Sequence, residues 1–179
     1  MAEPKYTISV DTGKSAKREM MITALNTGTA ASPAWKALGK KVEESSIDLD
    51  WGDETKKDIL GHVYTTAQKP TKEQEFSGNN FIGGDDVMNY IADLAIVKED
   101  FTALTQQECL IIHTYLTDST GKAFAERYSE CSILPSSLGG EGGGVLISDV
   151  TVKYGGTRTT GTATYSEDGG ITFTADSAA

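Results

Sequence analysis

The sequence contains few of the residues on which most metal-dependent and nucleophilic enzymes rely. Among 179 residues there are two histidines, His62 and His113, and two cysteines, Cys109 and Cys131. No run approaches 18 consecutive apolar residues, so no segment has the composition of a membrane-spanning helix. The first residues form neither a basic region nor an apolar stretch, so we expect no secretory signal and synthesis inside the cell.

The spacing of these four residues does not indicate a reaction centre. Neither Cys-x-x-Cys nor His-x-x-x-His occurs, and no Gly-x-Ser-x-Gly nucleophile elbow is present. We interpret His113, in an apolar segment, as a hydrogen-bonded core residue, and His62, beside a turn, as solvated. Cys109 and Cys131 are expected to be buried thiols, close together if residues 118–121 form a hairpin turn. We predict no catalytic, cofactor-binding or metal-binding residues.

Clustered positive charge is also absent. The formal net charge is −10 and the isoelectric point is near 4.6. Aromatic residues make up 8% of the chain and do not alternate with lysine or arginine. A protein that grips nucleic acid needs clustered cations or a basic surface with stacking rings. The composition therefore favours an acidic protein without specific nucleic-acid binding.

Period-two alternation of apolar and polar residues is the main pattern that is present. The clearest case is Ser46 to Trp51, where every second residue is apolar. Cys109 to Leu116 is apolar on both faces, which is typical of a strand buried on both sides. Further strands are predicted at 19–26, 61–68, 72–77, 122–134, 145–154, 159–165 and 170–175, the last two joined by a turn at 167–170.

One segment, about residues 84–97, predicts a helix. After the Gly83-Gly84 break, Asp85 and Asp86 occupy the N-cap and first-turn positions, where carboxylates are favourable. Apolar residues then recur at the spacing of one helical face, at Val87, Tyr90, Ile91 and Leu94. We predict a single domain, residues 1–179, with a mainly β fold: an antiparallel β-sandwich or barrel with one flanking helix.

Three segments are predicted to be irregular. They are a flexible N-terminal arm at 1–19, a long polar loop between two strands at 52–60, and a glycine-rich loop at 135–144. A β-rich body with flexible arms, a long polar loop and no reaction centre suits a protein whose function is to assemble.

Three stretches resemble the tail tube (major tail) proteins of tailed bacteriophages. The first runs from Trp35 to Gly61, where a tryptophan and a glycine precede a strand, a polar excursion and a returning strand. The second runs from Lys72 to Leu94, where a strand leads through Gly-Gly-Asp-Asp into the helix. The third, Gly161 to Phe173, is similar to the closing hairpin of that family. The arm at 1–19 and the glycine-rich loop have no counterpart.

The resemblance implies a structural virion protein that is not an enzyme and holds no cofactor. Six copies would form a ring whose sheets join into an inner barrel, and rings would stack into the tail tube that conducts the genome into the host. The implied partners are further copies and other tail proteins, such as tape measure, terminator or sheath. DNA would pass through the lumen without specific binding, and the subunit would have no membrane anchor. Assembly would occur in the host cytoplasm.

The resemblance also indicates where rings would meet. In this family the loop between the second and third strands reaches the adjacent ring, and it corresponds here to about Trp51–Gly61. Open sheet edges give a physical reason for such assembly, because joining copies satisfies unpaired backbone groups. An ordinary solvated hairpin tip is the alternative interpretation. The ring-stacking candidates are Trp51, Asp53, Glu54, Lys56, Lys57 and Asp58.

Other interpretations remain open at this point. A monomeric β-sandwich binding or adhesin module would be favoured by exposure of Trp51 or Tyr165. A small hydrolase would be built on Cys109, His62 or His113. Contractile and non-contractile tails, and bacteriocin or secretion tubes, would use the same subunit fold. If part of the acidic charge lines a lumen, we hypothesise that it repels DNA from the wall.

Overall fold

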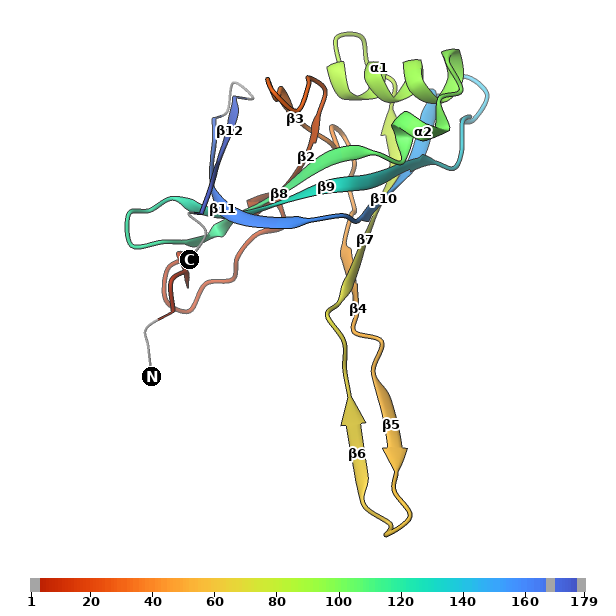
Figure 1. The fold of residues 1–179 in the computed structure, drawn as a ribbon. Coiled ribbons are helices and arrows are strands. Elements are labelled where there is room, and N and C mark those ends of the chain that lie inside the picture. Colours follow the sequence, from red (N-terminus) through yellow and green to blue (C-terminus); the bar gives the residue numbers. More distant parts are fainter. Residues whose placement is uncertain (1–3, 167–169, 177–179) are drawn as a thin grey trace.

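The computed structural model describes residues 4–166 and 170–176. Its body is a single antiparallel sheet of ten strands, with helices at one end and a narrow two-stranded ribbon, β5–β6, projecting from the other (Figure 1). The strands are β1 (Thr7–Ile8), β2 (Met21–Asn26), β3 (Trp35–Ala37), β4 (Ile47–Asp50), β5 (Glu54–Lys57), β6 (Val63–Thr66), β7 (Thr71–Asn80), β8 (Gln107–Thr117), β9 (Ala123–Pro135), β10 (Ile147–Tyr154), β11 (Arg158–Tyr165) and β12 (Ile171–Ala175).

The strand order confirms the predicted mainly β, antiparallel fold with a flanking helix. The path through the sheet is β3-β2-β8-β9-β10-β7-β4, with β1 added to β8 and the β11–β12 hairpin added to β9. Every strand that alternation predicted is present, with ends shifted by a few residues. The turn predicted at 167–170 lies almost entirely outside the described residues.

Strand β8 lies at the centre of the core. Burial on both faces was predicted for Cys109 to Leu116; it is confirmed for Cys109–Ile112, whereas residues 113–116 are only partly buried. Alternate residues enter two apolar clusters, because successive side chains of a strand point to opposite faces. Cys109 and Ile111 belong to the cluster that also contains Met88 and Ile91, and Leu110 and Ile112 belong to the cluster with Trp35.

The predicted helix is confirmed, beginning two residues later than expected. It comprises α1 (Asp86–Ala92) and a π-helical continuation, η2 (Asp93–Val97). The Asp85 carboxylate caps it by accepting hydrogen bonds from the backbone nitrogens of Val87 (3.1 Å) and Met88 (3.2 Å). Two short helices, η1 (Arg18–Met20) and α2 (Phe101–Leu104), were not predicted. None of the helices within 4–166 and 170–176 is long and apolar enough to cross a membrane.

The prediction of a loop at 52–60 is corrected by the structure, because four of these nine residues form a strand. Residues 54–57 form β5 and pair with β6, from Glu54 opposite Thr66 to Lys57 opposite Val63. All of the side chains of β5 are exposed, so the segment carries no apolar alternation by which to recognise it. The glycine-rich loop predicted at 135–144 is irregular from residue 136 on, apart from a bridge between Gly139 and Ile147, whereas Pro135 is the last residue of β9.

The described part of the N-terminal arm lies along the sheet. Strand β1 pairs with the end of β8, and the Tyr6 hydroxyl donates to the carbonyl of Gly161 at 3.3 Å. Cys109 and Cys131 are buried free thiols, as predicted. The hairpin turn predicted at 118–121 joins β8 to β9.

Candidate assembly surfaces

The most conspicuous surface feature is a β-ribbon of residues 51–68, here called the arm. Every residue in it is exposed, and it extends away from the sheet on the side opposite the helices (Figure 1). Backbone hydrogen bonds hold it along its length. At its root Gln68 N donates to Trp51 O (2.8 Å), and near its tip Asp58 N donates to His62 O (3.0 Å). At roughly 3.3 Å per residue it reaches about 25 Å beyond the sheet. The arm therefore adds nothing to the core of the isolated chain.

The tip of the arm is a rigid turn that displays two aliphatic side chains. One Asp58 carboxylate oxygen accepts hydrogen bonds from the backbone nitrogens of Leu60 (2.8 Å) and His62 (2.9 Å). Gly61 adopts a φ of +89°, which favours glycine. Hydrogen bonds, first from the His62 backbone, lower the pKa of Asp58. Ile59 is fully exposed and Leu60 is 76% exposed at the outermost point.

A second turn of the same design shows that these aliphatic residues are not needed for the geometry. At Asp118–Lys122 the carboxylate again accepts from the nitrogens two and four residues later, at 2.8 and 3.0 Å. Gly121 again has a positive φ, of +80°. The two middle residues there are Ser119 and Thr120. The turn requires the aspartate and the glycine, so Ile59 and Leu60 are available for contact with another molecule.

All six predicted stacking candidates lie on the arm. Lys56 Nζ pairs with Glu54 Oε2 at 2.5 Å, while Trp51 stands half exposed at the root of the arm. The sequence prediction missed the apolar tip, because Ile59 and Leu60 stand directly before a predicted strand. The repeated Asp-x-x-Gly pattern, with apolar residues in only one copy, is the signal that could have found them.

The buried carboxylate of Glu126 holds β7, the strand that follows the arm, to the rest of the sheet. Glu126, on β9, is 2% exposed. It accepts hydrogen bonds from Lys72 Nζ on β7 (2.5 Å), Arg158 Nε on β11 (2.5 Å) and the Tyr128 hydroxyl (3.0 Å), and lies 3.2 Å from His113 Nε2 on β8. The network thus links four strands.

The surroundings of Glu126 favour its ionised form. Burial opposes ionisation of Glu126, but hydrogen bonds from His113, Lys72 and Arg158 outweigh it and hold the pKa of Glu126 well below its ordinary value. His113 also lies 2.9 Å from the Tyr115 hydroxyl, through its other ring nitrogen. The prediction that His113 is a hydrogen-bonded core residue is confirmed.

The three residues considered for a hydrolase lie in different parts of the molecule. His62 is exposed near the arm tip, Cys109 is buried in the core, and His113 belongs to the Glu126 cluster. Within 4–166 and 170–176, no group of three or more His, Cys, Asp or Glu residues is arranged to hold a metal ion.

Several edges of the sheet carry backbone groups without a neighbouring strand. Among the described strands of the ten-stranded sheet, β1, β3, β4 and β12 each pair on one side only. An exposed edge is a template on which another chain can add a strand. These edges are therefore candidate surfaces for sideways contact between copies.

No known family model matches the sequence, and no curated protein matches it. Among solved structures, the chain is similar to the tube-terminating cap of the anti-feeding prophage, with 14% identity, coverage of 87% of this chain and 96% of that chain, and a TM-score of 0.49. It is also similar to the sheath/tube terminator of an extracellular contractile injection system (10% identity, 84% and 99% coverage, TM-score 0.49) and to a chain of the sheath-tube complex of such a system (9%, 84% and 94%, 0.47).

Proposed function

We propose that this chain is a structural subunit that assembles with copies of itself into six-membered rings stacked as a tail tube, with the arm making the contact between rings. The observation that carries the proposal is the arm itself. It buries no core, its turn is held by hydrogen bonds, and its tip presents two aliphatic side chains that the turn does not require. The role is mechanical and involves no bond chemistry.

The placement of the surfaces supports a stacked, open-ended assembly. The arm tip and the helices lie at opposite ends of the molecule (Figure 1). A contact that joins one end to the other end of the next copy uses two different surfaces and propagates without closing. The single-sided strands β1, β3, β4 and β12 offer backbone pairing for contacts within a ring.

The acidic composition suits a conduit. Six copies would bring a formal charge of six times −10 to each ring. Acidic groups facing the lumen would repel the phosphate backbone and let DNA slide without binding.

A shortened arm tests the proposal. In the variant, residues 52–67 are replaced by Asn-Gly, which closes a two-residue hairpin between Trp51 and Gln68 and leaves the core intact. We expect tubes of the unaltered protein in negative-stain micrographs, and single rings or monomers of the variant at equal concentration. Equal tube formation by both proteins would contradict the role of the arm.

A binding module is the second candidate, because Trp51 and Tyr165 are 50% and 43% exposed. Exposed aromatic rings are the usual contacts of a recognition surface. The same experiment separates the two functions, since a binding module would stay monomeric with and without the arm.

A further inference from the structure

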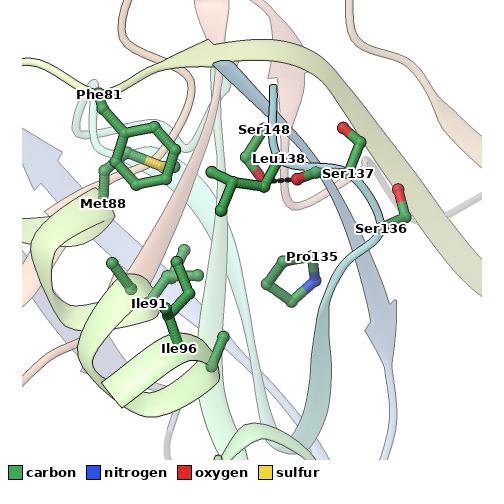
Figure 2. A pocket seen from close by; sticks show the side chains of 11 residues that line it. Phe81, Met88, Ile91, Ile96, Pro135, Ser136, Ser137, Leu138 and Ser148 are labelled. Carbon is green, nitrogen blue, oxygen red and sulfur yellow. Dashed lines mark hydrogen bonds between the residues drawn. The ribbon is translucent and has the colours of Figure 1, made fainter. Parts of the chain in front are cut away.

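An apolar cavity of about 280 Å³ opens between the long helix and the start of the glycine-rich loop. Figure 2 shows Phe81, Met88 and Ile91 on one side of it and Pro135 and Leu138 on the other. The π-helical segment η2 contributes further small and aliphatic side chains to its wall. π-helical turns frequently mark functional sites in helices.

Two of the three serines that line this cavity form hydrogen bonds within the protein. The Ser148 hydroxyl donates to the carbonyl of Ser137 at 2.7 Å, and the Ser137 hydroxyl donates to Asp149 at 3.0 Å. The third, Ser136, is exposed. The cavity therefore offers mainly apolar surface, and its natural guest is an aliphatic side chain. An apolar cavity of about 150 Å³ accommodates benzene, so this one has room for a branched side chain and part of a second.

Exposed apolar residues surround the mouth of the cavity. Ile96 and Leu138, which line the cavity, are about half exposed. The same helical end and loop carry further exposed apolar residues: Val97, Phe101, Val145 and Leu146. An exposed apolar patch of this kind marks a surface that another protein covers.

The arm tip matches this surface in chemistry and in position. It carries Ile59 and Leu60, with no apolar cover of their own, at the end of the molecule opposite the cavity. Charge adds little to this match. The helical segment 81–104 contains five acidic residues and one lysine, and the arm carries Lys56 and Lys57 beside Asp53, Glu54 and Asp58, with Lys56 paired to Glu54. Rim charges of this kind contribute more to orientation than to affinity.

We propose that the arm tip of one copy inserts Ile59 and Leu60 into the cavity beside α1 and η2 of a copy in the next ring. The proposal rests on the proposed function and specifies its contact. Each subunit then carries one plug and one socket at opposite ends, so that every ring can receive six arms and extend six. The occupant of the socket is a second copy of this chain.

Disulfide trapping tests this contact. In the L60C/L138C variant, one cysteine lies at the tip and the other at the mouth of the cavity, while the native Cys109 and Cys131 are buried. Assembled protein is oxidised with copper–phenanthroline and resolved on a non-reducing gel. We expect a head-to-tail ladder of dimers, trimers and longer species. The L60C/I8C variant, whose second cysteine is exposed on β1, serves as the control and should give no ladder.

The outcomes separate the socket from the function. Tubes that give no ladder, or the same ladder in the control, overturn the socket and leave the tube function standing. Absence of tubes from the unaltered protein overturns both.

A second variant, A95W, fills the cavity. It should raise the concentration needed for assembly about tenfold or more without changing the thermal midpoint of the subunit. A31W, which adds the same bulk on an exposed loop, should leave assembly unchanged.

Discussion

Glu126 shows at the scale of single residues how the sheet holds the arm in place. Its buried carboxylate forms ion pairs with Lys72 of β7, the strand that follows the arm, and with Arg158 of β11. Removing one partner of a buried charge cluster is costly, because the remaining charges lose their compensation. The cluster therefore makes the root of the arm part of the rigid body.

The Glu126→Gln variant measures this contribution. We expect the free energy of unfolding to fall by about 2–3 kcal/mol, because Lys72 and Arg158 keep their charge and lose the carboxylate. Urea denaturation of the subunit measures the change. Glu130→Gln, on an exposed position of the same strand, should change stability by less than about 0.5 kcal/mol. Equal effects of the two substitutions would show that the cluster does not stabilise the fold.

Acid should weaken the same cluster. The folded pKa of Glu126 is lowered from its ordinary value of 4.5, so the folded state binds fewer protons than the unfolded state below that pH. Its stabilisation is complete above about pH 4.5 and declines as the pH falls further. The difference in urea midpoint between the unaltered protein and Glu126→Gln should therefore be smaller at pH 3 than at pH 7. A difference that stays constant would contradict the assignment.

At the scale of elements, substitutions at the arm tip are expected to change assembly without changing the stability of the subunit. Replacing Ile59 and Leu60 by Ser and Thr gives the tip the residues found in the turn at 118–121. Because Asp58 and Gly61 still hold the turn, we expect the free energy of unfolding to stay within about 0.5 kcal/mol. Tube formation should be lost, since the apolar contact between rings is gone.

The reciprocal variant completes that comparison. Replacing Ser119 and Thr120 by Ile and Leu places the same aliphatic pair on the other hairpin and should leave tube formation intact. Micrographs and light scattering of both variants at one concentration provide the measurement. Tubes from the serine–threonine tip would contradict the role assigned to Ile59 and Leu60.

The sequence was sufficient to predict elements that bury one face. Period-two alternation located the strands of the body apart from the short β1 and β3, and the Asp85 cap with its apolar stripe located the helix. Strand β5 was missed because four exposed residues carry no pattern of burial. Strand β7 runs on to Asn80, three residues past the predicted end at 77, and the buried Asn79 side chain donates to the carbonyls of Phe76 and Ser148.

The candidate surfaces were only partly predictable for a related reason. The polar residues of the arm were identified as candidates by their place between two strands. The apolar tip and the cavity beside α1 depend on which side chains lack partners after folding, and a sequence does not state this. Ile59 lies in the segment 52–60, which was predicted to be a polar loop, and it is fully exposed in the structure.

The molecule as a whole has the polarity that a stacked assembly needs. A helical end with an apolar cavity and an arm end with an apolar tip lie on opposite sides of a sheet whose outer strands pair on one side only. In the proposed assembly, each of these surfaces would be covered by a different surface of another copy. The body of the subunit buries its two apolar clusters, and the arm tip lies outside both of them.

The mass of the purified, unaltered protein in solution, measured by analytical ultracentrifugation across a range of concentrations and paired with electron micrographs of the same samples, tests self-assembly most directly. We predict a concentration-dependent shift from subunits to large species that appear as six-membered rings and stacked hollow tubes. A single species of 19.1 kDa at every concentration, with no rings in the micrographs, would contradict the account.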